Sequence, residues 1–123
     1  PNEVDLYYNL ALSYAEVSDT ANAIKNYQKV LELDPTNYKT HNNLGSLYVS
    51  SGDFTAAERE YQLAIELSPT LFSLYYNLAN VYIKQNDSAN ALEALDKSLE
   101  LNPNFTQAKE KKELLMKEVT QNH

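Results

Sequence analysis

The fold is decided by residues 38–71, which read YKTHNNLGSLYVSSGDFTAAEREYQLAIELSPTL. The same pattern recurs 34 residues earlier and 34 residues later, in residues 4–37 and 72–105. The positions identical in all three copies are Asn9/Asn43/Asn77, Leu10/Leu44/Leu78, Tyr14/Tyr48/Tyr82, Asp19/Asp53/Asp87, Ala23/Ala57/Ala91, Glu32/Glu66/Glu100, Leu33/Leu67/Leu101 and Pro35/Pro69/Pro103. A unit of this length cannot bury its apolar face alone and must stack on its neighbours. The sequence therefore predicts a single domain, 1–123, built as an open array of three repeats.

Each repeat has the pattern of two helices separated by one polar turn. In the first repeat Tyr7, Leu10 and Tyr14 fall on one face of a helix, and a second apolar stripe follows the turn near Asp19. The residue before a proline is pushed out of the α region, so the second helix must end close to Pro35. Asp19 and its equivalents stand where a carboxylate can cap the second helix. No segment sustains the alternation of a strand, so we predict an all-α fold of helical hairpins.

Small residues recur where two helices must approach closely. Alanine or glycine occupies one position in every first helix and another in every second helix, namely Ala11, Gly45, Ala79, Ala23, Ala57 and Ala91. Close packing of helices requires such gaps, which large side chains of the opposing helix then fill. We therefore expect these positions to lie in the core of each hairpin.

The two ends of the array differ. Residues 106–119 predict one more helix, with a thin apolar stripe of Ala108, Leu115, Met116 and Val119 and an otherwise charged surface, as expected of a capping helix. No equivalent helix precedes the first repeat, so we expect an uncapped N-terminal end. This end predicts either further repeats upstream in a parent protein or end-to-end self-association of the chain.

Composition excludes several classes of function. The net charge is −7, which argues against nucleic acid or an anionic membrane as the main partner. No apolar run is long enough to span a membrane, so we expect a soluble protein without membrane insertion, and we interpret it as cytoplasmic. The chain has no cysteine, which excludes disulfides and thiolate metal sites and leaves the redox compartment undetermined. His41 and His123 are its only histidines and lie far apart, and no glycine-rich phosphate loop is present. We therefore predict no enzymatic activity, no cofactor and no metal, and a packing role for His41.

With this repeat pattern, the chain resembles the tetratricopeptide repeat family. The residues that carry the resemblance in the second repeat are the small Gly45, Ala57 and Ala64, the tyrosines Tyr48 and Tyr61, and the closing Pro69. The stretch YYNLANVY at 75–82 is especially similar, and the resemblance covers residues 4–105, with the final helix similar to the family's solvating helix. It departs at Leu95 and Ser98, where the family usually has an aromatic residue and an alanine.

The resemblance implies a right-handed α-solenoid whose first helices line a concave groove that binds peptides or protein segments. In this sequence the face of the first helices opposite the buried stripe carries our candidate binding residues. They are Tyr8, Asn9, Leu12, Asn42, Asn43, Ser46, Tyr76, Asn77, Asn80 and Lys84. An asparagine amide offers both a donor and an acceptor, so the three asparagines that repeat at this face could pair with the backbone of an extended ligand. The pattern is similar to the asparagine ladder of O-GlcNAc transferase repeats.

Three alternatives remain open at this stage. The asparagines could instead be tied to a neighbouring helix, which would make them structural. The module could be a self-assembly scaffold, or the non-catalytic targeting arm of a larger enzyme. A fourth possibility, the co-chaperone clamp for acidic C-termini, is disfavoured, because the matching positions Tyr8, Leu12, Asn43, Ser73 and Asn77 supply no cation to hold a carboxylate.

Overall fold

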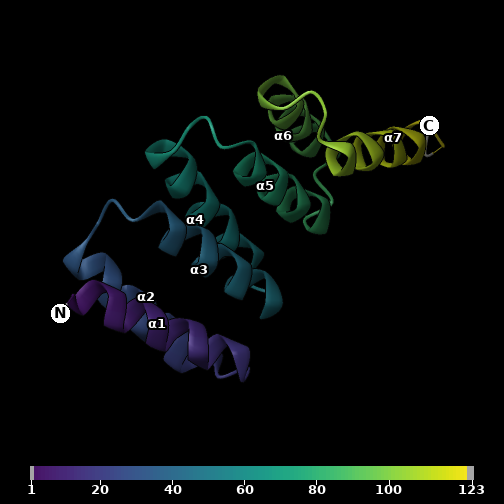
Figure 1. Cartoon of the computed structure of the whole chain (residues 1–123). Helices are drawn as coiled ribbons and strands as arrows, with labels where there is room; N and C mark the ends of the chain where they lie inside the picture. Colours follow the sequence, from purple (N-terminus) through teal and green to yellow (C-terminus); the bar gives the residue numbers. More distant parts are fainter. Residues whose placement is uncertain (1, 122–123) are drawn as a thin grey trace. The chain divides into compact units, whose positions relative to one another are not determined.

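The computed structural model describes residues 2–121, and these residues form seven α-helices joined by short turns (Figure 1). The chain divides into two compact units, Pro1–Leu67 and Ser68–His123. Unit 1 holds α1 (Glu3–Glu16), α2 (Thr20–Leu33), α3 (Tyr38–Ser50) and α4 (Phe54–Leu67). Unit 2 holds α5 (Phe72–Lys84), α6 (Ser88–Leu101) and α7 (Thr106–Gln121). The predicted all-α fold of three helical hairpins followed by a C-terminal helix is confirmed.

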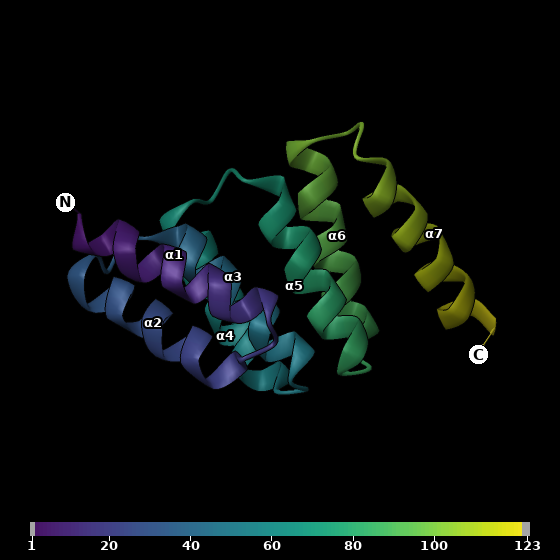
Figure 2. The ribbon, with the colours of Figure 1, turned by 60° about the horizontal axis from the view of Figure 1, so that its bottom comes forward.

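Within each unit, helices that are consecutive in the chain pack side by side (Figure 2). In unit 1, α1 packs on α2 and α3 on α4, and α2 also contacts α3. In unit 2, α5 packs on α6, and α7 lies against α6. Within unit 1, the contact of α2 with α3 stacks the first hairpin on the second, and within unit 2, α7 covers α6, as the sequence pattern predicts for neighbouring repeats.

The turn inside each hairpin uses one residue in the left-handed conformation. Ser18, Gly52 and Asn86 occupy equivalent positions and have φ values of 61°, 79° and 60°. In the first repeat a hydrogen bond closes the turn: the backbone N–H of Asp19 donates to the carbonyl oxygen of Tyr14 at 2.8 Å. This left-handed turn satisfies carbonyls that the ending helix leaves free. The same turn geometry therefore recurs even though only one of the three residues is glycine.

The aspartates that follow these turns cap the second helices, as predicted. In each case a carboxylate oxygen accepts a hydrogen bond from a backbone N–H of the first helical turn. The pairs are Asp19 with Asn22 at 3.3 Å, Asp53 with Ala56 at 3.2 Å and Asp87 with Asn90 at 3.2 Å. Each second helix therefore begins at a residue that the repeat specifies.

The expected close approaches of helices are present. Ala11, Ala23, Ala57, Ala79 and Ala91 are all fully buried. At Gly45 a side-chain Cβ would lie only 2.7 to 2.9 Å from three ring atoms of Tyr61, so α3 and α4 meet there too closely for any larger residue.

Leu10 does not lie in the buried stripe where we expected it. Its side chain is 38% exposed, whereas Leu44, at the same repeat position, is only 2% exposed. Leu44 is buried because it packs against Ala11 and Tyr27 of the hairpin before it. The described residues include no hairpin before α1 that could cover Leu10 in the same way.

The C-terminal helix α7 has one buried side and one exposed side, but its buried apolar stripe is narrower than predicted. Ala108 and Leu115 are buried, whereas Met116 is 50% exposed. Met116 follows Tyr82 by 34 residues, and Tyr82 packs against the core that α5 and α6 share. Met116 is exposed because α7 has no second helix of its own within residues 2–121. The helix also continues beyond the predicted end at residue 119, to Gln121.

Candidate functional site

The candidate binding residues divide between the two units, and each unit is described by itself. Unit 1 carries Tyr8, Asn9 and Leu12 on α1 and Asn42, Asn43 and Ser46 on α3. Unit 2 carries Tyr76, Asn77, Asn80 and Lys84 on α5. Asn9, Leu12, Ser46 and Lys84 are exposed, and the other six are half-buried. In each unit, therefore, some of the candidate residues are accessible to a ligand and others are partly packed against the structure.

A side-chain hydrogen bond connects the first helices of the two repeats in unit 1. The Asn43 side-chain Nδ2 donates a hydrogen bond to the Tyr8 hydroxyl at 2.9 Å, which connects α3 to α1. The ring of Tyr8 meets the ring of Tyr27 edge-on, with the centroids 5.8 Å apart. Edge-to-face contacts of this kind are favourable for aromatic pairs. Asn43 is therefore tied to a neighbouring helix, the structural alternative that the sequence left open.

Tyr27 lies beneath this contact. The pKa of its hydroxyl is raised from 10.0 to about 12, mainly by burial and to a smaller extent by the nearby Tyr8, while the neighbouring Asn43 amide acts to lower it. Water is the usual stabiliser of a phenolate, and Tyr27 is only 1% exposed, so the neutral form is strongly preferred. The three side chains form one polar contact across the first two repeats, which we call the Tyr8–Tyr27–Asn43 cluster.

Unit 2 anchors its candidate residues with aromatic side chains instead. Phe105 meets Phe72 edge-on at 4.8 Å and Tyr76 edge-on at 5.0 Å, measured between ring centroids. Tyr76 thus packs into the core of unit 2 while remaining half-buried. Phe105 was not a candidate in the sequence, because its equivalents in the earlier repeats are Asn37 and Leu71. A residue that does not repeat gives no periodic signal, and only its aromatic character pointed to a core role.

Ser98 shows how a departure from the family pattern is accommodated. It is fully buried, and its hydroxyl donates to the backbone carbonyl of Phe72 at 2.9 Å, which links α6 to the start of α5. A buried hydroxyl without a partner would be costly, and this bond removes the cost. Leu95, the other departure, is also fully buried.

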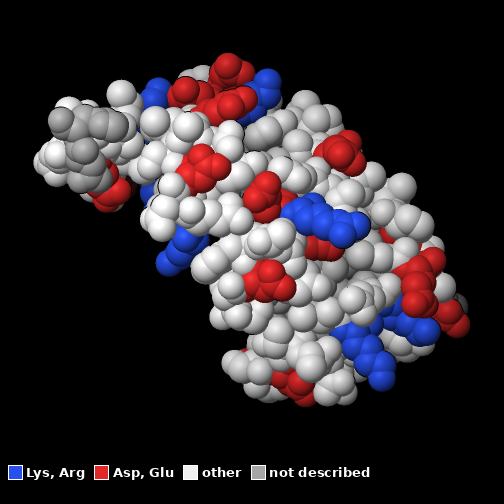
Figure 3. Space-filling model, turned by 180° about the vertical axis from the view of Figure 1, so that it is seen from behind, with Lys and Arg blue, Asp and Glu red and all other residues white. Residues whose placement is uncertain are grey.

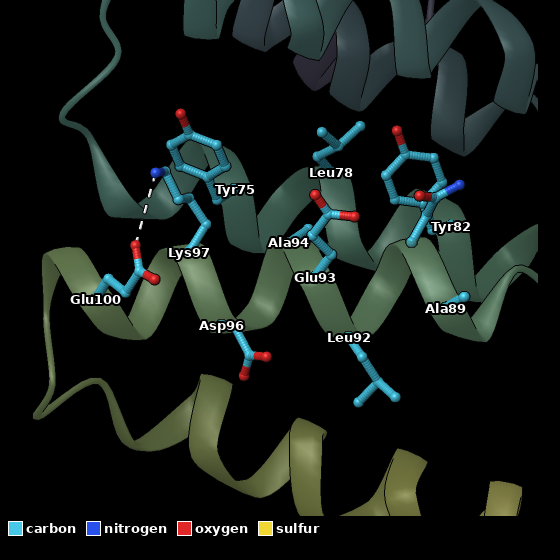
Figure 4. Close-up of a pocket in the computed structure, with 11 residues that line it drawn as sticks. Tyr75, Leu78, Tyr82, Ala89, Leu92, Glu93, Ala94, Asp96, Lys97 and Glu100 are labelled. Carbon is cyan, nitrogen blue, oxygen red and sulfur yellow. Dashed lines mark ion pairs between the residues drawn. The ribbon is translucent and has the colours of Figure 1, made fainter.

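A depression of about 730 Å³ lies between α5 and α6 in unit 2 (Figure 4). Tyr75, Leu78 and Tyr82 line it from α5, and Glu93 and Lys97 line it from α6. Figure 4 also shows Leu92 and Asp96 pointing to the other side of α6, toward α7. There Asp96 forms an ion pair with Lys112 of α7 at 2.6 Å. The depression combines tyrosine rings with charged rims and holds no arrangement typical of an active site.

His41 has the packing role that the sequence predicted, with one polar contact in addition. It is buried, and its Nδ1 lies 3.3 Å from a carboxylate oxygen of Glu60 on α4. Burial raises the pKa of the neighbouring Tyr48, and the carboxylates of Glu60 and Asp53 raise it further. His41 thus links α3 to α4 within the second hairpin.

The two units differ in charge. Residues 1–67 contain ten acidic and four basic residues, whereas residues 68–123 contain seven acidic and six basic ones. On the face drawn in Figure 3, basic side chains are scattered among acidic ones and form no continuous patch. Such a surface does not favour a polyanionic partner.

Two further features are absent from residues 2–121. This part of the chain holds no group of three or more histidine, cysteine, aspartate or glutamate side chains that could bind a metal ion. None of its helices combines the length and the apolar character needed to cross a membrane.

The fold and the site together define a helical-hairpin repeat protein that presents an open polar and aromatic face. Models of the tetratricopeptide repeat match residues 4–37 and 72–105, which is more than half of the chain, and a second such model matches residues 26–59. A further model, described as TPR repeat, matches residues 45–86. The chain belongs to the tetratricopeptide repeat family.

Solved structures agree with this assignment. Two crystal structures of MamA are 28% and 26% identical to the chain, with TM-scores of 0.90 and 0.87, and cover 98% and 95% of it. The chain spans 70% and 64% of the length of those two MamA chains. No curated protein sequence matches it.

Two structures with the same fold were solved with peptides. The first TPR of Spaghetti (RPAP3), bound to the HSP90 peptide SRMEEVD, is 21% identical with a TM-score of 0.89, covering 96% of this chain and 94% of that one. The type III secretion chaperone SycD of Yersinia enterocolitica, in complex with a peptide of the translocator YopD, is 18% identical with a TM-score of 0.87, covering 93% and 92%. At these identities the likeness concerns the fold.

Proposed function

We propose that the three repeats and α7 act as one non-catalytic module that binds an extended peptide or protein segment along the faces of its first helices. The observation that carries the proposal is the repeated asparagine of these faces, flanked by exposed or half-buried Tyr8, Leu12 and Ser46 in unit 1. Amides supply hydrogen bonds to a backbone, and the aromatic and aliphatic side chains supply contact area. The peptide complexes of RPAP3 and SycD, which share the fold, support this proposal.

The experiment starts from a peptide, because the natural ligand is unidentified. A random 12-residue library is displayed and selected on the full chain, and the tightest peptide is synthesised and titrated by calorimetry. Asn9→Ala is the first variant, since Asn9 is exposed and its loss should leave the melting temperature unchanged. Gln28→Ala, an exposed change on α2, is the matched control. Weaker binding by the Asn9 variant alone supports the proposal, and equal binding by both variants contradicts it.

The HSP90 peptide SRMEEVD, which is bound in the RPAP3 structure, is a probe that we expect not to bind this chain. The positions that match the co-chaperone clamp hold no lysine or arginine here, and unit 1 carries an excess of acidic residues. A terminal carboxylate needs charge-assisted hydrogen bonds to be held. We expect the peptide SRMEEVD to produce no saturable anisotropy change at any concentration up to the millimolar range. Saturation in the micromolar range would show that another set of residues forms a clamp.

A second candidate function, self-association, is favoured by one observation. Leu6 and Leu10 fall on one face of α1 and Val17 directly follows its last residue, and the three are 57%, 38% and 74% exposed. An apolar stripe of this kind favours contact with another surface. We expect the weight-average mass in sedimentation velocity to rise with protein concentration, and Leu6→Glu with Val17→Glu to abolish the rise. Leu114→Glu, a change at an equally exposed leucine of α7, is the control. A constant monomer mass for the unmodified chain would exclude this candidate.

A further inference from the structure

Two exposed leucines of α1 occupy repeat positions that are buried in the later repeats. Leu10 is 38% exposed, whereas Leu44, at the same repeat position, is 2% exposed because it packs against Ala11 and Tyr27 of the first hairpin. Leu6 is 57% exposed, whereas the residues at its repeat position in α3 and α5 are buried. Leu6 and Leu10, which we call the α1 leucines, therefore have the positions of a contact between hairpins, and residues 2–121 include no hairpin before α1.

The end of unit 2 shows the opposite situation, because the apolar partners are present and the leucine is missing. Ala79 and Leu95 have the repeat positions of the two partners of Leu44, and both are fully buried in the core of unit 2. The residue of α7 that has the repeat position of Leu44 is Lys112. A lysine can lay its methylene stem on an apolar surface, but its amine has to stay in water or near an opposite charge.

Few contacts hold α7 on this surface. Ala108 and Leu115 are its buried residues, and both join the core that α5 and α6 form. Lys112 adds an ion pair, with its Nζ 2.6 Å from a carboxylate oxygen of Asp96, which points from α6 toward α7 (Figure 4). The two side chains of this pair are 36% and 53% exposed, and an ion pair as exposed as this one contributes little. The docking of α7 therefore belongs to the weaker contacts of unit 2.

The α1 leucines match this surface better than α7 does at two of three repeat positions. Leu10 has the repeat position of Lys112 and brings no amine that must be solvated. Leu6 has the repeat position of Ala108 and is the larger side chain, so it can bury more apolar area. At the position of Leu115, α7 is the more apolar helix, because α1 has a serine there. The chain thus carries both halves of a hairpin contact, and a second copy supplies the half that each copy lacks.

We propose that the end of unit 2, with Ala79 and Leu95 in its core, docks the α1 leucines of a second copy, and that α7 is a displaceable cover of this docking surface. The inference rests on the second candidate function, self-association, and names the surface that the α1 leucines meet and the element that regulates the contact. Because the two surfaces in contact differ, the contact is heterologous and copies add head to tail. Since α7 must leave first, its own contacts set the concentration at which copies assemble.

The test is sedimentation velocity on the full chain over a concentration series, with hydrogen exchange of α7 measured in parallel. Lys112→Glu places a second acidic group beside Asp96, so we expect faster exchange in α7 and association that is about fivefold stronger. Lys112→Leu supplies the leucine of the repeat, so we expect slower exchange in α7 and association that is about tenfold weaker. Lys117→Glu makes the same change of charge at an exposed lysine of α7 and should alter neither quantity.

A substitution on α1 separates specific docking from aggregation of an uncovered surface. Leu10→Glu should abolish association both in the unmodified chain and in Lys112→Glu. Association of Lys112→Glu that persists with Leu10→Glu would overturn the inference. So would equal association of the unmodified chain and of both Lys112 variants, which is the result expected if two copies meet through α1 alone. Unchanged hydrogen exchange of α7 in Lys112→Glu would refute its role as a displaceable cover.

Failure of this inference and failure of self-association give different results. If the unmodified chain associates and the Lys112 variants behave like it, self-association stands and the inference fails. If the unmodified chain stays monomeric while Lys112→Glu associates through Leu10, self-association of the unmodified chain fails and the inference stands. If Lys112→Glu is also monomeric at every concentration, both fail.

Discussion

Unit 1 and unit 2 are built from the same 34-residue repeat, yet different chemistry holds the candidate binding residues of each unit in place. In unit 1 a hydrogen bond between Asn43 and Tyr8 joins α3 to α1, and the ring of Tyr8 packs on the buried Tyr27. In unit 2 the ring of Tyr76 on α5 meets the ring of Phe105 edge-on, and Tyr76 packs against the apolar core of the unit. The repeated residues therefore set the hairpin, and the residues that do not repeat set the character of each face.

The difference extends to the residue that fills the centre of each hairpin. Tyr27 and Tyr61 are the central residues of the two hairpins of unit 1, whereas the equivalent residue of unit 2 is Leu95. A tyrosine brings a hydroxyl that must be accommodated, while a leucine can be surrounded by apolar atoms alone. The two units should thus respond differently to truncation of the core and to alkaline pH.

The largest expected effect of a single substitution is the loss of the central residue of unit 2. Leu95→Ala removes a fully buried side chain, which costs about 2–5 kcal/mol because the cavity cannot fully collapse. We expect urea unfolding to show this loss and hydrogen exchange to become faster in α5, α6 and α7. Leu101→Ala, at a partly exposed leucine of α6, should cost less than about 1 kcal/mol. Equal losses for the two variants would contradict the described core.

Alkaline pH should weaken unit 1 selectively. Burial raises the pKa values of Tyr27 and Tyr61 from 10.0 to about 12. The unfolded chain ionises at pH 10 while the folded one does not, so this stabilisation is complete below pH 10 and is lost as the pH rises through 12. Two pKa units correspond to about 3 kcal/mol per tyrosine. Circular dichroism and tyrosinate absorbance should report the transition, and Tyr27→Phe with Tyr61→Phe should move it to higher pH. If the alkaline transition of this double variant stays at the same pH, ionisation of Tyr27 and Tyr61 is not its cause.

A smaller effect is expected where α3 and α4 approach most closely. In Gly45→Ala the added methyl group meets the Tyr61 ring, which is itself buried, and overpacking of this kind costs about 1–3 kcal/mol. The loss should appear as a lower urea midpoint with helicity unchanged. Ala79→Gly in unit 2 is the opposite change at the equivalent position. If Gly45→Ala instead stabilises the chain, as the change from glycine to alanine does in a solvent-exposed helix, the Tyr61 ring must move aside.

Removing an aspartate N-cap from a second helix should give the smallest loss of stability, and the loss should be the same in both units. Asp19→Ala in unit 1 and Asp87→Ala in unit 2 each remove one capping carboxylate, which costs about 1 kcal/mol. Because the two caps are built alike, the two variants should shift the thermal midpoint by nearly the same amount. A large difference between them would indicate that the caps interact with their surroundings in ways that the repeat does not specify.

Most of the fold could be predicted because it depends on residues that recur every 34 positions. The hairpins, the aspartate caps and the small residues at close contacts all follow from local rules applied three times. The predictions failed where a residue's environment depends on what lies next to the repeat. Leu10 is exposed because no described hairpin covers it, and Met116 is exposed because α7 has no partner helix among residues 2–121.

The candidate site was predicted less completely for a related reason. The sequence placed the asparagines on one face of the first helices, but the choice between a ligand contact and a tie to a neighbouring helix depends on distances between helices. The structure supplies one such distance, from Asn43 to Tyr8, and that pair involves positions 35 residues apart that do not recur as a pair. Phe105 was missed because neither earlier repeat has an aromatic residue there.

The central claim, that the chain binds extended peptides through its repeated asparagines, is tested most directly by one titration. The display-selected peptide is titrated into the unmodified chain and into Asn43→Ala/Asn77→Ala, with far-ultraviolet circular dichroism to check that helicity is retained. We predict that the double variant binds at least about tenfold more weakly, since each lost hydrogen bond contributes about 0.5–1.5 kcal/mol. Equal affinity of the two proteins for the peptide would contradict the claim.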